Sequence, residues 1–271
     1  MKFIFVAPMF MFGFVPVAAF AQEETSPVTV SGSATLASDY RFRGVSQTDK
    51  GMAVQGGLTV THESGLYVGT WASNLSGWGT FGGANMELDL IAGYKFPLTD
   101  NATLDVGLTW YMYPSGADDT DFAEPYVKLS GTTGPLSLTA GAAYAPKQYA
   151  LANVSNHPDS RSQKQDNLYL WGDGAMGIAG TPFTAKAHIG YSNGNPGLGP
   201  NGTSVAPTGE YWDWSMGVDT NWRNLTFNIS YVDTDISHRE AARLQPNFSK
   251  GQDGVGSISD GTVMASLTAA F

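Results

Sequence analysis

Ionisable side chains recur at two-residue spacing within extended, alternating segments of this chain. Arg41 and Arg43 form one such pair, and Glu87 and Asp89 form another. In a strand, residues two apart project from the same face, so each pair lies on one side of its strand. Charged side chains that line a narrow passage orient water and polar solutes and set ion preference. The chemistry favoured by this spacing is therefore the recognition of solutes or ions rather than the making of bonds.

Other alternating segments present further charged and aromatic residues on their polar side, and we expect these to line the same lumen. The predicted pore-lining residues are Arg41, Arg43, Glu87, Asp89, Asp105, Tyr111, Glu124, Tyr126, Lys128, Lys186 and Asp213. Acidic residues outnumber basic ones in this set, which predicts a mild preference for cations or zwitterions. The alternative, that the two arginines pair with Glu87 and Asp89 and only staple or plug the wall, is also open.

Patterns of catalytic or metal-binding residues are not found. The four histidines are His62, His157, His188 and His238, and none lies in a nucleophile motif or at metal-ligand spacing. The acidic run 118–121 lacks the spacing of a calcium loop. Cysteine is absent, which excludes disulfides and thiolate chemistry. We predict that the chain is not an enzyme and has no cofactor and no metal site.

The elements that would position these residues are about twelve amphipathic strands. In the first, Val28, Val30, Ala34 and Leu36 alternate with serine and threonine. The predicted strands are 28–36, 52–63, 66–74, 86–96, 104–111, 122–131, 136–145, 166–176, 183–191, 212–219, 225–231 and 260–271. Most are long enough to cross a bilayer at a tilt. The facing of 66–74 and of 166–176 is ambiguous, so ten or fourteen strands are also open.

The connections between these segments alternate between long and short. Outer-membrane barrels have short turns on the periplasmic side and long loops outside, and an even number of strands returns the C-terminus to the side where the first strand starts. A soluble sandwich would have shorter strands and no such alternation. We therefore predict an all-β fold, a closed antiparallel up-and-down transmembrane β-barrel with lipid outside and water inside.

Composition supports this class of protein. Only 14% of residues are charged, against about a quarter in a soluble domain, and 12% are aromatic. Aromatic residues near strand ends, Tyr40 and Phe42 among them, are predicted to face outward in belts at the two membrane interfaces. Tyr111, Tyr113 and Tyr126 are predicted to point inward, where they are candidates for solute contact. With 14 basic against 24 acidic residues and no basic cluster, nucleic acid is excluded as a partner.

The first 21 residues are typical of a cleaved signal peptide. Lys2 precedes the apolar run 3–20, and residues 19–21 have the small-residue pattern of a cleavage site. An N-terminal membrane anchor is the alternative, but Pro8 and Pro16 interrupt the run. We predict a signal peptide over residues 1–21 and a single barrel domain over residues 22–271.

Five short stretches near the N-terminal end have sequences that are typical of a known family. They are 38–48 (SDYRFRGVSQT), 55–57 (QGG), 62–74 (HESGLYVGTWASN), 87–89 (ELD) and 93–94 (GY). Together they resemble the TorF-type porin family of Gram-negative bacteria, and the resemblance covers residues 38 to 94. It implies an outer-membrane location and a channel, but neither a defined substrate nor a set of functional residues. The terminal Phe271 resembles the signal by which outer-membrane barrels are recognised for assembly, although Ala269 stands where a bulkier residue is frequent.

From these observations we predict an outer-membrane channel for the passive diffusion of small polar solutes or ions. Twelve strands give an interior between that of filled eight-stranded barrels and that of open sixteen-stranded porins, so only small solutes are expected to pass. The expected partners are outer-membrane lipid, those solutes and, during biogenesis, the barrel-assembly machinery. The alternative is a barrel with an occluded lumen whose outer loops bind a partner.

Overall fold

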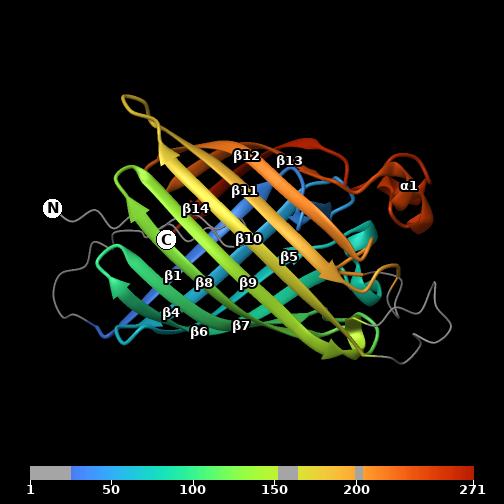
Figure 1. Cartoon of the computed structure of the whole chain (residues 1–271), viewed down its shortest axis with the longest axis horizontal. Helices are drawn as coiled ribbons and strands as arrows, with labels where there is room; N and C mark the ends of the chain where they lie inside the picture. Colours follow the sequence, from blue (N-terminus) through green and yellow to red (C-terminus); the bar gives the residue numbers. More distant parts are fainter. Residues whose placement is uncertain (1–25, 152–163, 199–203) are drawn as a thin grey trace.

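Twelve antiparallel strands close into a barrel in the computed structural model, which describes residues 26–151, 164–198 and 204–271 (Figure 1). The barrel strands are β1 (Val28–Ala37), β4 (Ala53–His62), β5 (Leu66–Asn74), β6 (Met86–Thr99), β7 (Ala102–Met112), β8 (Phe122–Thr133), β9 (Leu136–Gln148), β10 (Gln165–Gly177), β11 (Phe183–Gly194), β12 (Glu210–Trp222), β13 (Leu225–Thr234) and β14 (Thr262–Ala270). The predicted closed barrel of twelve strands is confirmed. The predicted signal peptide, residues 1–21, lies outside the described residues.

Strand β1 closes the barrel by pairing with β4 on one side and with β14 on the other. Ser33 lies opposite Gly57 in the first ladder and opposite Ala270 in the second. Beyond β14, the backbone of Phe271 exchanges two hydrogen bonds with Gly32, at 2.7 and 2.9 Å. A Cβ atom at Gly32 would lie 2.7 Å from the Phe271 ring, so this glycine makes room for the terminal side chain. Closure leaves neither edge of the sheet unpaired.

The alternation in the sequence becomes the two faces of the barrel wall. Val30, Val54 and Ile229 are 59%, 62% and 63% exposed on the outer face, as predicted. Of the two strands with ambiguous facing, β5 turns Leu66 outward and Tyr67 inward. Strand β10 likewise turns Leu170 outward and Tyr169 inward.

Glycines on neighbouring strands explain why large rings are accommodated inside. A Cβ atom at Gly93 would lie 2.4 Å from the Tyr67 hydroxyl oxygen, and one at Gly141 would lie 2.2 Å from the Trp171 ring. Each ring therefore occupies the space that a side chain on the facing strand would fill. The sequence leaves the facing of β5 and β10 ambiguous because this fit depends on residues far away in the chain.

Long loops gather at one end of the barrel and short turns at the other (Figure 1). The backbone N–H of Ala270 donates to Asn224 in the short turn after β12, which returns the C-terminus to the short-turn end, as the parity argument predicts. The long loops carry α1 (His238–Ala241) and the 3₁₀ turns Gly77–Gly79, Phe81–Gly83, Tyr149–Leu151, Ala242–Leu244 and Lys250–Gln252. Among the described residues, no helix is long and apolar enough to cross a membrane.

The connection between β1 and β4 folds into the barrel, contrary to prediction. Its two short strands, β2 (Arg41–Phe42) and β3 (Val45–Ser46), pair through a turn at Gly44, where φ is 79°. We call residues 38–52 the inner hairpin. Tyr40 and Phe42 are each only 7% exposed, so their predicted place in an outward aromatic belt is wrong.

The reason is that β1 already ends at Ala37. Beyond it, Asp39 holds the inner hairpin together by accepting hydrogen bonds from Ser46 at 2.5 Å and Thr48 at 3.0 Å. A two-residue alternation that continues past the end of a strand does not distinguish a longer strand from a hairpin that folds inward.

Two apolar clusters fill the outer end of the barrel between the inner hairpin and the loops. One gathers Tyr40 and Phe42 with residues of the wall and of the neighbouring loops, such as Phe81. The other joins Val45 to the last long loop, including Phe248. The hydrophobic core of this protein therefore lies under the loops, while the barrel wall faces outward with its own apolar side.

Candidate functional site

The inner hairpin reaches across the lumen to the far wall. The Nη2 atom of Arg43 donates to both carboxylate oxygens of Glu124, at 2.7 and 2.8 Å. Glu124 lies on β8, the fourth strand beyond β4 in the order of the barrel. Because the hairpin begins at β1 and returns to β4, this contact spans most of the width of the barrel. Arg43 and Glu124 are 5% and 4% exposed, so the ion pair is buried.

Aromatic rings complete the surroundings of Arg43. Its guanidinium carbon lies 4.2 Å from the centre of the Tyr169 ring on β10 and 4.7 Å from that of Phe42. Burial by itself lowers the pKa of Arg43, but the Glu124 carboxylate outweighs this effect and holds the pKa above its ordinary value. Among the described residues, Nε and Nη1 have no hydrogen-bond partner. Arg43 is thus a fixed positive charge inside the lumen.

Tyr40 holds the inner hairpin to the wall on the side of β6. Its hydroxyl donates to Glu87 at 3.1 Å, and its ring meets that of Trp71 edge-on, with 5.2 Å between the centres. Burial, followed by the negative charges of Glu87 and Asp89, raises the pKa of Tyr40 well above its ordinary value. The hydroxyl therefore keeps its proton and donates throughout the physiological pH range.

Arg41 contacts the hairpin itself and the loop before β14, whereas Arg43 contacts the far wall. Its Nε pairs with Asp39 at 2.9 Å, and its Nη1 donates to the carbonyl oxygens of Gly44 and Asp260. Arg41 therefore stiffens the hairpin and ties it to the loop before β14. Within the described chain, neither arginine forms an ion pair with Glu87 or Asp89, so the predicted stapling partners differ from the ones observed.

The predicted charged residues of the wall pair with one another along its surface. Lys128 on β8 lies 3.2 Å from Asp105 on β7, and Lys186 on β11 lies 2.9 Å from Asp219 on β12. The sequence suggests charges that face one another across a pore. In the structure these pairs instead join neighbouring strands, because antiparallel register places opposite charges next to each other.

His188 joins three strands of the same wall. Its Nδ1 lies 2.7 Å from Asp173 on β10, and its Nε2 lies 3.1 Å from Asp213 on β12. Tyr169 donates to Asp213 as well, which links this group to Arg43 on the inner hairpin. The predicted pore-lining set omits Asp173, His188 and Asp219. Strand alternation places His188 and Asp219 inward, whereas Asp173 lies on a strand of ambiguous facing.

The remaining predicted residues also face the interior. Tyr126 contacts the hydroxyl of Tyr67, which donates to Asp105 at 2.7 Å. Tyr111 donates to Glu124 at 3.2 Å and stacks on Phe122, with 4.5 Å between the ring centres. Glu87 and Asp89 lie beside the inner hairpin, 2% and 1% exposed, and no ion pair to either is found in the described chain.

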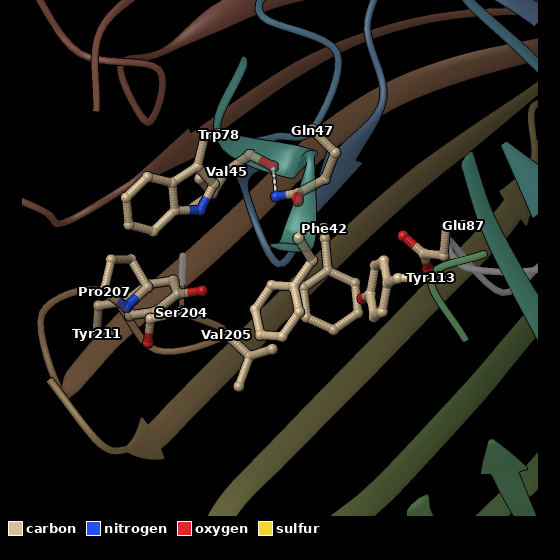
Figure 2. Close-up of a pocket in the computed structure, with 11 residues that line it drawn as sticks. Phe42, Val45, Gln47, Trp78, Glu87, Tyr113, Ser204, Val205, Pro207 and Tyr211 are labelled. Atoms are coloured by element: carbon tan, nitrogen blue, oxygen red, sulfur yellow. Dashed lines mark hydrogen bonds between the residues drawn. The ribbon is translucent and has the colours of Figure 1, made fainter. Parts of the chain in front are cut away.

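A small cavity lies on the outer side of the inner hairpin. Figure 2 shows it among the rings of Phe42, Trp78, Tyr113 and Tyr211, with Glu87 at one end. Its volume of about 20 Å³ is enough for a single water molecule. The described residues around this cavity are therefore in close contact with one another.

Several solved structures have a fold similar to that of this chain. The NanC porin is 14% identical, with a TM-score of 0.53, and the match covers 89% of this chain and 98% of that chain. A porin refined at 1.8 Å resolution is 10% identical, with a TM-score of 0.43 over 90% and 100%. OpdQ of Pseudomonas aeruginosa is 9% identical, with a TM-score of 0.39 over 90% and 67%. At these identities the likeness concerns the fold alone, and of these three structures only the NanC porin has a TM-score above 0.5.

The fold is a closed antiparallel β-barrel of twelve strands, similar in architecture to the NanC porin. A family model described as a bacterial protein of unknown function (Gcw_chp) matches residues 21–271. The chain therefore belongs to the Gcw_chp family. No curated relative matches it.

Proposed function

We propose that this protein is an outer-membrane channel for the passive diffusion of small polar solutes or ions. The observation that carries the proposal is the closed barrel with an apolar outer face and a polar inner face. Such a wall is stable where lipid covers its outside and water fills its inside. The resemblance of residues 38 to 94 to TorF-type porins supports the same function. That the chain is not an enzyme stays a prediction.

The inner hairpin is the constriction of the proposed channel. Arg43 and Tyr40 hold it against β8 and β6, while Arg41 ties it to the loop before β14. A solute that enters from the long-loop end meets this hairpin before it reaches the rest of the lumen. Passage therefore depends on displacement of residues 38–52 from the wall.

Planar lipid bilayers test the proposal directly. The purified protein is expected to give discrete single-channel steps, and solutes above a size limit are expected to be excluded. In a salt gradient the reversal potential should favour cations, because acidic residues outnumber basic ones among the predicted pore-lining residues. A reversal potential that favours anions would refute the predicted ion preference.

A second candidate function is supported by the packing of the outer end. Two apolar clusters and the inner hairpin fill this end, as expected for an occluded barrel whose loops bind a partner. Silent bilayers for the wild-type chain, and also for a variant in which Glu124→Gln weakens the hold on the hairpin, would support this binder and exclude the channel. Conductance steps from either protein exclude a permanently occluded lumen.

A further inference from the structure

The inner surface of the barrel is divided into two unlike halves. Charged side chains that face the lumen lie on β6 to β12. The lumen-facing positions of β13, β14, β1 and β4 carry no charge, and apart from Val232 and Met264 they carry hydroxyl, amide and small side chains. Antiparallel register aligns one row of them across four neighbouring strands: Thr226 opposite Thr268, Thr268 opposite Thr35, and Thr35 opposite Gln55. We call the lumen-facing side of these four strands the hydroxyl wall.

The two halves differ in their access to water. On the charged side, Asp105, Asp173, Asp213 and Asp219 are all buried, at 9% exposure or less. On the hydroxyl wall, most of the lumen-facing residues of β1, β4 and β14 are half-buried or exposed. These aspartates are covered by partners such as Lys128, Lys186 and His188, which are themselves half-buried. A larger share of the lumen-facing residues is therefore accessible on the hydroxyl wall than on the charged side.

The two halves also differ in the hydrogen-bonding capacity that they offer. The charged side chains are engaged in pairs such as Lys128 with Asp105 and Lys186 with Asp219. By contrast, the hydroxyls of Ser31, Ser33 and Thr59 form no hydrogen bond with other described residues. A hydroxyl both donates and accepts, so this wall can replace the water around another hydroxyl group. It cannot replace the shell of a full charge, whose desolvation is far more costly.

We propose that solutes pass along the hydroxyl wall and that the preferred class is small uncharged polyhydroxylated molecules, such as short polyols and monosaccharides. The proposal rests on the channel function above and names its substrate class. Ions pass more slowly than neutral polyols of equal size, and among ions the cations lead. The half-buried Trp71 lies on β5, next to the hydroxyl wall, and its ring packs against Tyr40 of the inner hairpin.

Swelling of proteoliposomes tests the substrate class with three probes of one size. Xylitol is neutral, xylonate carries one negative charge, and the corresponding 1-amino-1-deoxy polyol carries one positive charge at neutral pH. The expected order of uptake is xylitol first, then the cation, then the anion. Uptake of either ion as fast as that of xylitol would overturn the proposal.

Paired substitutions test the route. In the double variant Thr35→Val and Thr268→Val, two hydroxyls that bond each other at 2.9 Å are replaced by methyl groups of the same shape. The expected result is a loss of about fivefold in xylitol uptake, the size of effect that corresponds to one net hydrogen bond. Thr109→Val with Thr139→Val is the matched control, because these threonines are buried on the charged side, 5% and 9% exposed. The control is expected to keep the wild-type uptake.

The outcomes distinguish a failure of the proposed route from a failure of the proposed channel. Equal losses in both double variants, or no loss in either, contradict a route along the hydroxyl wall while the channel function stands. Absence of uptake for all three probes, together with silent bilayers for the wild type and for Glu124→Gln, refutes the channel itself.

Discussion

Arg43 and Glu124 lie at the point where the inner hairpin meets the far wall, and their chemistry determines how firmly it is held. A buried guanidinium loses its hydration, and the carboxylate compensates only while both partners are present. Tyr169 and Phe42 add aromatic faces on which the cation lies. The Arg43–Glu124 ion pair therefore fixes the inner hairpin against the far wall.

We predict that Glu124→Gln raises the fraction of time for which the channel is open. Breaking a buried ion pair costs about 3 kcal/mol, which weakens the state with the hairpin against the wall. Single-channel recordings measure the open fraction. Asp219→Asn is the matched control, since it removes the same charge from an ion pair on the wall with Lys186. Equal open fractions in both variants would argue against the idea that the Arg43–Glu124 ion pair keeps the inner hairpin against the wall.

Glycines that face large rings form a second set of critical residues. We predict that Gly93→Ala lowers the free energy of unfolding by about 1–3 kcal/mol, because the new methyl group would lie 2.4 Å from the Tyr67 hydroxyl oxygen. Gly177→Ala is the control, since nothing lies within 4 Å of a Cβ atom there. Denaturant titration in detergent, followed by tryptophan fluorescence, measures the difference. A similar loss in the control would mean that chain flexibility, not the ring, sets the effect.

At the scale of elements, the inner hairpin behaves as a separate unit that is held by its contacts. Its strands β2 and β3 pair with each other and with no barrel strand, and few backbone hydrogen bonds, such as that from Ser38 to Ala265 on β14, join it to its surroundings. Its position rests mainly on ion pairs, side-chain hydrogen bonds and apolar packing under the loops. Elements with few backbone hydrogen bonds to their surroundings open at lower free energy than the sheet around them. The hairpin is therefore the part of the barrel that can move while the wall stays intact.

Because the chain has no cysteine, one introduced thiol reports on this movement. We predict that a water-soluble maleimide labels the Val45→Cys variant much more slowly than the Val255→Cys variant, since Val45 is 2% and Val255 is 74% exposed. Adding Glu124→Gln should accelerate labelling at position 45 and leave position 255 unchanged. Rapid labelling at position 45 in the wild-type background would contradict the buried hairpin.

For the whole molecule, closure of the sheet is the step that makes the lumen. Closure depends on one seam, where β1 meets β14 and the Phe271 ring lies over Gly32. The ladder between β1 and β14 is short, with five aligned residue pairs against ten between β1 and β4. The seam is therefore expected to be the weakest line of the barrel.

We predict that Gly32→Val weakens this seam, because its side chain would displace the Phe271 ring. The barrel should then unfold at a lower temperature in the semi-native gel assay, in which folded barrels migrate faster than unfolded ones. Gly56→Val is a control on the neighbouring strand, where a Cβ atom meets its nearest neighbour at 3.5 Å. Similar unfolding temperatures for the two variants would show that the terminal ring does not stabilise closure.

The sequence by itself determined the barrel. Alternation at period two, strand length and the parity of long and short connections are local properties, and each is readable one segment at a time. They predicted the strand number and the outward face, for example Val54 and Ile229 exposed on the outside of the barrel. They also predicted inward carboxylates such as Glu124 and Asp213, because facing follows from position along a strand.

Only the tertiary structure decided what those inward residues do. The inner hairpin looks like a continuation of β1 in sequence, and its inward fold depends on Glu124 and Tyr169, which lie 81 and 126 residues beyond Arg43. The pairing of charges along the wall depends on the register between strands, and the exposed hydroxyl wall emerges when β13, β14, β1 and β4 become neighbours at closure. Contacts of this kind are set by distance in space, which a two-residue pattern along the chain does not contain.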